Sequence, residues 1–341
     1  MTDLTLEDIA RQAGVSRSTV SRVVNQSPDV SEAVRTRVLR LIEHTGYQPH
    51  AAARALASQH SLTIGLLLPQ SVNSFFTDPY FSHLTKGIAQ ACNQANYTLA
   101  LFLVSTKADE EKIFPRLSRP GFVDGVIVQS GPHGEQSIIS RFLDAKLPMV
   151  IAGRPFRTDN VTYIDVDNLN GAYTAVSHLI QLGRRRIGLI GGPTDSTAGI
   201  DRKEGYLRAL RERGCEPEQA LLADGDFTEV GGYYSMQRLL PAKPNAIFAA
   251  SDVMALGAMR AVREAHLRIP EDIAFVGFDD LPISTLSDLH LTTVRQPVVQ
   301  FGAKAVDILI DLIEHGIDPP RHIIMGTELV IRGSCGAIRG N

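Results

Sequence analysis

The sequence predicts a small all-α helix-turn-helix head followed by an α/β core of two doubly wound parallel-sheet lobes. Three short amphipathic segments with helix-capping residues lie within residues 5–46, and strand-sized apolar runs alternate with helical stretches from Leu62 onward. At roughly 100–200 residues per domain, a chain of 341 residues has room for two or three domains with their own cores. With 44% hydrophobic and 21% charged residues, it is too apolar to be a disordered protein.

The head is expected to contain three helices in residues 1–49. Thr5 and Asp8 form a variant of the capping box at the start of the first helix, and Gly14 ends that helix. Ser16 is suited to cap the second helix, and Gly46 to stop the third. Two short helices joined by a turn that contains glycine are the skeleton of a helix-turn-helix. The alternative is a small helical cap with only a structural role.

The second expected helix exposes short polar side chains and arginines that are able to reach base edges and phosphates of DNA. Residues 1–60 hold seven arginines and no lysine against six acidic residues, a net charge of +1, while the whole chain has a net charge of -3. Charge alone therefore does not identify a DNA-binding head, and the prediction rests on the pattern of helices and exposed side chains. These side chains are Arg17, Ser18, Ser21 and Arg22.

Residues 50–61 are expected to form a hinge helix and a linker to the core, which spans residues 62–341. The alanine-rich stretch 50–58 favours a helix, yet it is shorter than the roughly 12–15 residues that an isolated helix needs in water. We therefore expect a conditional helix, which becomes ordered when a partner segment and DNA contribute contacts. Leu56 is its only large apolar side chain. A plain linker is the alternative.

The core is expected to hold parallel sheets that helices cover on both faces, because continuous apolar strands alternate with helical stretches. This part of the chain is too long for one open sheet, which favours two lobes. Ligands of such sheets bind beyond the carboxyl ends of the strands, a place that becomes a cleft between two lobes. The strand-sized runs include 64–68, 99–103, 123–128, 148–152, 186–191, 246–249 and 273–277, and the helical stretches include 169–182, 202–213 and 254–265.

Polar and aromatic side chains at the expected strand ends suit a small polyhydroxylated ligand. A carboxylate and a guanidinium bind vicinal hydroxyls with bidentate geometry, and an aromatic face covers the apolar side of a sugar ring. Each residue has a structural alternative, since the aspartates are able to cap following helices and the arginine to pair with a surface acid. The residues are Arg202, which is expected to open a helix, Phe227, Ser251, Asp252, Asp279 and Asp280.

Several classes of protein find no support in the sequence. It holds no G-x-S-x-G elbow, no G-x-x-x-x-G-K-[ST] phosphate loop and no H-E-x-x-H, so we expect no catalytic residues, cofactor or metal. Cys92, Cys215 and Cys335 are too far apart for a readable disulfide framework or zinc cluster, and reduced thiols are expected. No apolar run approaches the roughly 18 residues of a membrane span, and the acidic N-terminus is not a secretory signal. We therefore expect a cytoplasmic protein without a membrane partner.

The head resembles the LacI/GalR family of bacterial transcription repressors in residue order and spacing. The matching segments are 6–10 (LEDIA), 13–16 (AGVS), 19–25 (TVSRVVN), 46–49 (GYQP) and 53–56 (ARAL). His50 departs from the family pattern, in which an asparagine is common after the proline. The resemblance continues through 250–257 and 276–280 to about residue 334.

This resemblance implies a dimeric repressor whose two heads bind a palindromic operator. It implies paired hinge helices in the minor groove, with Leu56 opening a central base step. It also implies a core like that of periplasmic sugar-binding proteins, crossed three times by the chain, with lobes of about 62–162 plus 293–323 and 163–292 plus 324–341. The expected DNA contacts are Thr5, Ser16, Arg17, Ser18, Thr19, Ser21, Arg22, Asn25, Ala53, Arg54 and Leu56.

The resemblance further implies that a small effector between the lobes controls operator affinity allosterically. The effector is expected to be a sugar, with a phosphorylated sugar or a nucleobase as alternatives, and its sign as inducer or corepressor stays open. A solute-binding protein is an alternative from another class, which the intact head disfavours. No leucine heptad follows Val330, so a dimer is expected. The expected effector contacts are Asp78, Tyr80, Phe81, Gln129, Arg202, Phe227, Ser251, Asp279 and Gln296.

Overall fold

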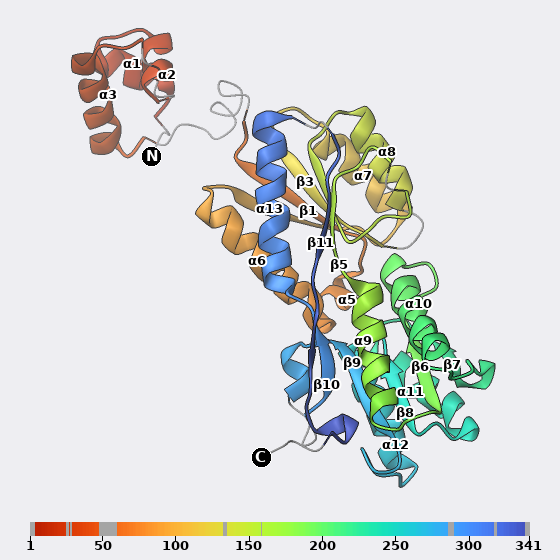
Figure 1. Ribbon diagram of the computed structural model, residues 1–341. Helices are drawn as coiled ribbons and strands as arrows, with labels where there is room; N and C mark the ends of the chain where they lie inside the picture. Colours follow the sequence, from red (N-terminus) through yellow and green to blue (C-terminus); the bar gives the residue numbers. More distant parts are fainter. Residues whose placement is uncertain are drawn as a thin grey trace.

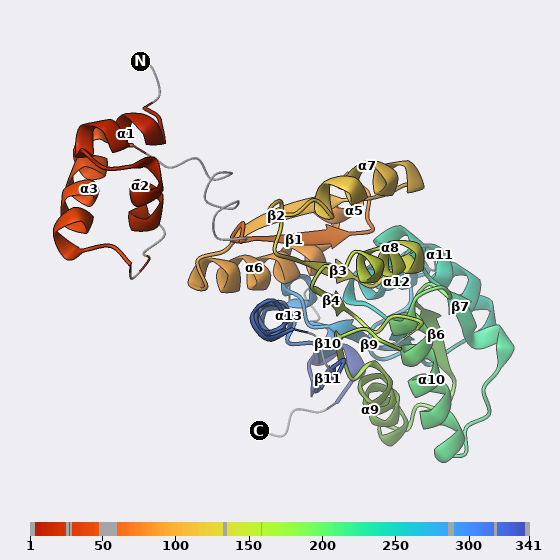
Figure 2. The same cartoon turned by 90° about the horizontal axis from the view of Figure 1, so that it is seen from above.

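Three helices form the head of the protein, α1 (Leu6–Ala13), α2 (Arg17–Val24) and α3 (Glu32–Thr45). The structure is a computed structural model, and it describes residues 4–24, 27, 29–47, 60–131, 135–157, 159–285, 290–316 and 319–337, without the side chains of 135–137. Ile9, Val20, Val23 and Val38 from the three helices meet in one small buried core. The expected three-helix head is confirmed, and Figures 1 and 2 show it beside the first lobe and apart from the second.

The ends of the head helices follow from their capping residues. Thr5 Oγ1 accepts the N–H of Asp8 at 3.3 Å, and the Asp8 carboxylate accepts the N–H of Thr5 at 3.0 Å, which completes the predicted capping box. Ser16 Oγ accepts the N–H of Thr19 at 3.1 Å at the start of α2. Gly14 and Gly46 adopt left-handed conformations, with φ of 61° and 63°, and end α1 and α3.

The first lobe is built on a six-stranded parallel sheet with the order β11-β5-β4-β3-β1-β2. Its strands are β1 (Thr63–Leu68), β2 (Thr98–Leu103), β3 (Gly125–Gln129), β4 (Met149–Ala152), β5 (Tyr163–Val166) and β11 (His322–Met325). Its helices are α5 (Val72–Thr77), α6 (Pro79–Gln94), α7 (Lys107–Leu117), α8 (Glu135–Asp144) and α13 (Val298–His315).

The second lobe is built on a second six-stranded sheet with the order β12-β10-β9-β8-β6-β7, in which β12 alone runs antiparallel to its neighbour. Its strands are β6 (Ile187–Gly191), β7 (Leu222–Asp224), β8 (Ala246–Ala249), β9 (Ala274–Asp279), β10 (Thr292–Arg295) and β12 (Glu328–Val330). Its α-helices are α9 (Asn168–Gln181), α10 (Thr197–Glu212), α11 (Glu229–Leu239) and α12 (Asp252–Glu264). Short 3₁₀ turns cover Gln219–Leu221, Leu240–Ala242, Pro282–Thr285 and Gly333–Cys335.

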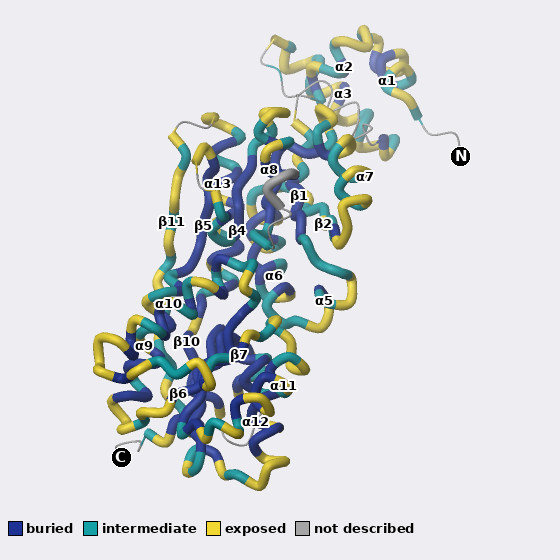
Figure 3. Tube along the Cα trace, turned by 90° about the vertical axis from the view of Figure 1, so that its right-hand side faces the viewer, coloured by how far each residue is buried: buried dark blue, intermediate teal, exposed yellow. Residues whose placement is uncertain are grey.

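Helices cover both faces of each sheet, as the continuous apolar strands predict. In the first lobe, Leu66 packs in a core beneath α6 and α13, while its neighbour Leu67 packs in a core beneath α7 and α8. In the second lobe, Phe248 and Ile247 separate in the same way between the α9–α10 side and the α11–α12 side. The buried strands of both lobes stand out in Figure 3. The doubly wound α/β core is therefore confirmed.

The chain crosses between the lobes after β5, after β10 and after β11. The lobe boundaries were expected at 162/163, 292/293 and 323/324. Each lies a few residues before the observed crossing, which follows Val166, Arg295 and Met325 in turn. β5 belongs to the first sheet, where Tyr163 pairs with Ile151 and His322, and β10 belongs wholly to the second, where Arg295 pairs with Asp279. Apolar patterning locates a strand but does not say which sheet receives it, because pairing register decides that.

The entry of the chain into the first lobe is fixed by one carboxylate. Asp124, which precedes β3, accepts the N–H of Ser61 at 2.5 Å, the hydroxyl of Ser61 at 2.8 Å and the N–H of Leu62 at 2.9 Å. The residues just before β1 are thus bound to the body of the sheet. None of the described helices is long and apolar enough to cross a membrane.

Candidate functional site

Arg202 lies at the centre of the candidate site and is 5% exposed. Its Nε donates to Asn168 Oδ1 at 2.9 Å and its Nη1 donates to the carbonyl oxygen of Ala250 at 2.6 Å. The guanidinium lies 3.8 Å from the centroid of the Phe278 ring, a cation–π contact. The prediction that Arg202 opens its helix is wrong, because Ser196 caps α10 and the helix begins at Thr197. Arg202 therefore sits deep in the lobe, held by three other segments.

Asp279 ends β9 and faces Arg202, with its Oδ1 3.5 Å from the Arg202 Nη1. It also accepts a hydrogen bond from Gln296 Nε2 at 2.5 Å. Desolvation by burial raises the pKa of Asp279 to about 7, against the opposing effect of the Arg202 charge. The predicted carboxylate–guanidinium pair is thus present and buried. The alternative of a surface ion pair for Arg202 does not apply.

Ser251 and Asp252 lie at the start of α12 and make different hydrogen bonds. Ser251 Oγ accepts the N–H of Met254 at 3.2 Å, so this hydroxyl caps the helix. Asp252 is fully buried and accepts the Thr293 hydroxyl at 2.5 Å and the Leu281 N–H at 3.1 Å. Desolvation by burial, followed by the nearby charge of Asp279, raises the pKa of Asp252 well above its ordinary value. The Asp252 carboxyl group therefore links α12 by hydrogen bonds to β10 and to the segment that follows β9.

The first lobe contributes Tyr80, which is half-buried and whose phenol feels charges of both lobes. Burial raises its pKa, and the charges of Asp165 and Asp279 raise it further, while the Arg202 charge opposes the shift. Asp78 caps α6 by accepting the Tyr80 N–H at 2.9 Å, and burial raises the pKa of its carboxyl. Phe81 is 7% exposed and packs in the first-lobe core, so it supports Tyr80 from behind.

Gln129 ends β3 and carries an unsatisfied acceptor. Its Nε2 donates to the carbonyl oxygen of Ser130 at 3.3 Å, but its buried Oε1 has no hydrogen-bond partner among the described residues. A buried acceptor without a partner costs about 1–3 kcal/mol, which a hydroxyl donor reaching this oxygen would offset.

The backbone is strained at three residues of the second-lobe part of the site. Phe227, Asp279 and Asp280 have φ of 63°, 127° and 57°, backbone conformations that residues other than glycine rarely adopt. Such residues cluster at ligand-binding sites, where surrounding contacts hold them in place. Phe227 lies 5.8 Å from the Arg202 guanidinium, measured to the ring centroid.

Contacts between the lobes flank this site. Arg154, which follows β4 of the first lobe, donates to both carboxylate oxygens of Asp201 on α10 at 2.6 and 2.7 Å. The hydroxyl of Thr197 donates to the carbonyl oxygen of Arg154 at 2.5 Å. The start of α10, five residues before Arg202, is therefore bound to the first lobe.

The candidate DNA-binding face lies on α2. Arg17, Ser18 and Arg22 are exposed, and Arg17 Nη1 lies 3.3 Å from Glu7 Oε1 on α1. Thr5 and Ser16 cap helices, while Thr19 and Ser21 are half-buried. Asn25, Ala53, Arg54, Leu56 and the hinge lie outside the described residues.

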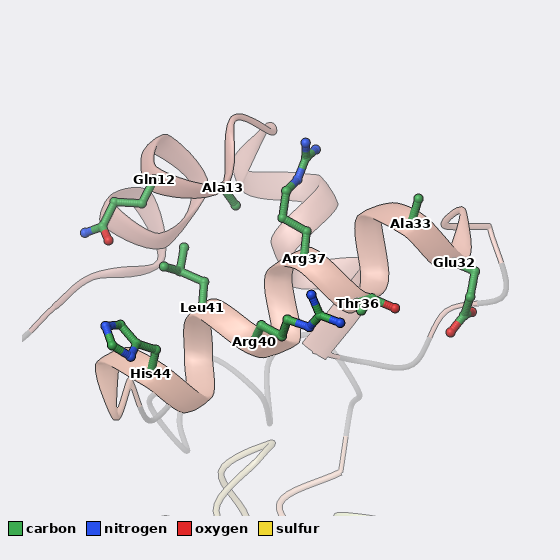
Figure 4. Close-up of a pocket in the computed structure, with 9 residues that line it drawn as sticks. All are labelled: Gln12, Ala13, Glu32, Ala33, Thr36, Arg37, Arg40, Leu41 and His44. Atoms are coloured by element: carbon green, nitrogen blue, oxygen red, sulfur yellow. The ribbon is translucent and has the colours of Figure 1, made fainter.

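A hollow of about 710 Å³ lies between α1 and α3 of the head. Figure 4 shows Arg37 and Arg40 of α3 lining it with Gln12 of α1. No residue of α2 lines this hollow, so it is separate from the candidate DNA-binding face. The sequence analysis did not predict it.

Comparison with known proteins decides the family. The family described as "Bacterial regulatory proteins, lacI family" matches residues 5–50, and the one described as "Periplasmic binding protein-like domain" matches residues 176–335. The HTH-type transcriptional regulator CelR of Thermobifida fusca is 36% identical over 334 residues, which cover 97% of this chain and 98% of CelR. The chain belongs to the lacI family.

Two solved structures extend the likeness of this lacI-family protein to its whole length. A complex of the transcriptional regulator CelR with cellobiose has a TM-score of 0.77 and 34% identity, covering 97% of this chain and 99% of that one. A lac repressor dimer bound to operator and the anti-inducer ONPF has a TM-score of 0.85 and 28% identity, covering 98% and 100%. The predicted family and fold class are confirmed.

Sequence reasoning missed several residues of this lacI-family site. Asp165 on β5 is 6% exposed, and burial raises its pKa to about 6. Asn168 donates to Asp165 Oδ1 at 3.2 Å and accepts from Arg202, so it links the two charged residues. A carboxylate inside an apolar strand is the signal that would have identified Asp165. Among the described residues, no group of three His, Cys, Asp or Glu side chains is arranged to hold a metal ion.

Proposed function

We propose that this lacI-family protein is a transcriptional repressor that binds palindromic operator DNA as a homodimer, under the control of a small neutral sugar held between its lobes. The observation that carries the proposal is the buried Arg202–Asp279 pair, whose charges act on the Tyr80 phenol of the other lobe. The same chain also carries a helix-turn-helix head. The operator-bound lac repressor dimer and the cellobiose-bound CelR support the two binding partners.

The chemistry of the site favours a polyhydroxylated ligand. Asp279 and Arg202 offer an acceptor and donors to neighbouring hydroxyls, and the unsatisfied Gln129 Oε1 accepts a third. Phe227 and Tyr80 supply aromatic faces for the apolar side of a sugar ring. The proposed effector contacts therefore combine both lobes, which is the condition for a ligand that alters their arrangement.

The charge of the site disfavours a phosphorylated effector. Arg202 is surrounded by the carboxyl groups of Asp165, Asp252 and Asp279, with Asp78 near Asp279. Its Nε and Nη1 already donate to Asn168 and Ala250, and Nη2 is the third nitrogen of the guanidinium. A phosphate dianion would bring negative charge to four acidic residues that share the single cation Arg202, because Arg154 is paired with Asp201. An uncharged sugar meets no such repulsion.

Control of DNA binding follows from contact with both lobes. A ligand changes an equilibrium only by binding the two lobe arrangements with different affinity. Arg202 and Asp279 belong to the second lobe and Tyr80 to the first, so an effector among them favours one separation of the lobes. The proposed operator contacts are those of the α2 face, which the core presents in pairs when two chains associate.

Two experiments test this proposal on the full-length protein. Selection from random duplex DNA followed by mobility shift is expected to return a palindrome bound by two chains. Thermal unfolding against a panel of neutral and phosphorylated sugars is expected to reveal stabilisation by a neutral sugar, since a ligand at 100 times its Kd adds about 2.7 kcal/mol. Enrichment of no palindrome would overturn the operator proposal. Stabilisation by phosphorylated sugars alone would overturn the effector class.

A further inference from the structure

The short helix α5 is an uncharged segment fixed beside the proposed effector site. It lies between the carboxyl end of β1 and α6, and Ser71 caps it by accepting the N–H of Ser74 at 3.0 Å. The N–H of Asp78 donates to the carbonyl oxygen of Ser74 at 3.1 Å, while the Asp78 side chain caps α6. The position of α5 is therefore coupled to that of Tyr80.

The two sides of α5 have opposite exposure. Phe75 is 8% exposed and packs in the first-lobe core. Val72 and Phe76, four residues apart and so on the same side of the helix, are 61% and 77% exposed. Phe76 has the largest exposed fraction among the large hydrophobic residues that the structure describes. A ligand that covers this exposed phenylalanine removes apolar surface from water, which stabilises the complex.

A continuous series of aromatic rings connects the buried site with this exposed surface. The Tyr80 and Phe81 centroids are 5.5 Å apart, Phe81 and Phe75 6.3 Å, and Phe75 and Phe76 5.0 Å. Tyr80 lies near Arg202 at one end, and Phe76 reaches solvent at the other.

The surroundings of Phe76 suit a sugar better than a charged or purely apolar partner. Residues 70–77 (QSVNSFFT) contain no charged side chain, and the exposed Asn73 adds an amide one helical turn before Phe76. The Thr77 hydroxyl donates to the carbonyl oxygen of Asn73 at 3.0 Å. In Figures 1 and 3, which are related by a turn about the vertical axis, α5 lies at the height where the two lobes meet. An exposed aromatic face with a neighbouring amide is a surface on which a neutral sugar ring can pack and form hydrogen bonds.

We propose that Phe76 and Val72 form a second sugar subsite, so that the effector is a disaccharide or a longer saccharide. This inference rests on the proposed function. One sugar ring lies between Arg202, Asp279 and Tyr80, and the next ring packs on Phe76 at the junction of the lobes. Phe76 thereby determines the length of saccharide that the protein recognises.

The test is calorimetric titration of the full-length protein with neutral monosaccharides and with the disaccharides built from them, glucose with cellobiose and maltose first. The best disaccharide is expected to bind at least about tenfold more tightly than its monosaccharide, because its second ring buries Phe76. Phe76→Ala removes this advantage and leaves monosaccharide affinity unchanged, whereas Phe76→Trp retains it. Leu182→Ala, which truncates an exposed apolar residue after α9, is the matched control and changes neither affinity.

Each other outcome overturns the inference in a distinguishable way. If the wild type binds monosaccharide and disaccharide equally, there is no second subsite, although the proposed sugar site stands. If Phe76→Ala weakens both ligands equally, Phe76 supports the first site. If it changes the oligomeric state in sedimentation experiments and not the saccharide preference, α5 contacts a second copy of the chain. If no neutral saccharide binds the wild type, the proposed function itself fails.

Discussion

Gln296 donates a hydrogen bond from Nε2 to the Asp279 carboxylate at 2.5 Å. Gln296 lies between β10 of the second lobe and α13, which packs on the first lobe. The carboxyl group that faces Arg202 is thus bonded to a segment that crosses between the lobes. A ligand that engages Asp279 would therefore act on this crossing through the side chain of Gln296.

Removal of either member of the central pair is expected to abolish the effector response and to spare effector-free operator binding. Arg202→Ala deletes the donors for ligand hydroxyls, and Asp279→Asn keeps an acceptor for Gln296 while removing the charge. If the ligand is an inducer, both variants repress permanently, and if it is a corepressor, both fail to repress. Operator binding with and without ligand measures this.

The control for this experiment is Arg211→Ala, an exposed arginine on the same helix. Loss of a buried charge partner costs about 3–5 kcal/mol, so thermal unfolding of Arg202→Ala must be measured alongside. Wild-type responsiveness in a folded Asp279→Asn protein contradicts the assignment.

Replacement of Arg17 by alanine is expected to weaken the selected operator by about 1–3 kcal/mol and to leave binding to random DNA nearly unchanged, because a base contact carries sequence information. Arg40→Ala is the matched control, since Arg40 lines the hollow between α1 and α3 and not the α2 face. Mobility shifts on both duplexes provide the comparison. An equal loss on the two would identify Arg17 as a phosphate contact.

Leu56→Ala tests the hinge, which lies outside the described residues. Alanine preserves helix propensity but removes the apolar wedge, so operator affinity and DNA bending are expected to fall while effector binding stays normal. Circular-permutation mobility shifts measure the bend. A variant that bends DNA like the wild type rules out minor-groove insertion by this residue.

The acid cluster predicts a loss of stability with rising pH. The pKa of Asp279 is raised to about 7, so between about pH 4 and 7 the folded protein keeps a proton that the unfolded chain has released. The free energy of unfolding then falls as pH rises, by at most about 1.4 kcal/mol per pH unit for one such group. Above pH 7 this group contributes no further change.

Urea unfolding of wild type and Asp279→Asn at several pH values measures the effect. Between pH 6 and 7, the free energy of unfolding is expected to fall less steeply with pH in the variant, because the Asp279 carboxyl group no longer contributes. Asp165 contributes only up to its pKa of about 6, so it does not add to this part of the slope. Identical slopes in the two proteins contradict a protonated Asp279.

The sequence was sufficient where local chemistry alone decides structure. Thr5, Gly14 and Gly46 predict where the head helices begin and end. Capping hydrogen bonds and left-handed residues involve only neighbours a few positions away in the sequence. The strands of the core were visible as apolar runs for a similar reason.

What the sequence did not predict depends on pairing across long distances. The assignment of β5 to the first sheet follows from its register with β4 and β11, the latter more than 150 residues away. The link from Asp165 through Asn168 to Arg202 joins three elements that only the folded chain brings together. Ser251 was expected to contact the effector, but its hydroxyl caps α12 by accepting the N–H of Met254.

The anchoring of Ser61 and Leu62 by Asp124 has a mechanical consequence. Three crossing segments join the lobes, so we expect any relative motion of the lobes to be a rotation about an axis through these segments. Displacement in a rotation grows with distance from its axis, and β1 begins at the end of its sheet away from the lobe junction, where Asp124 holds the entering chain rigidly. A small change of angle at the ligand therefore becomes a larger translation where the chain leaves for the head. In a pair of chains, that translation changes the spacing of the two heads, the quantity that a palindrome with fixed half-site separation measures.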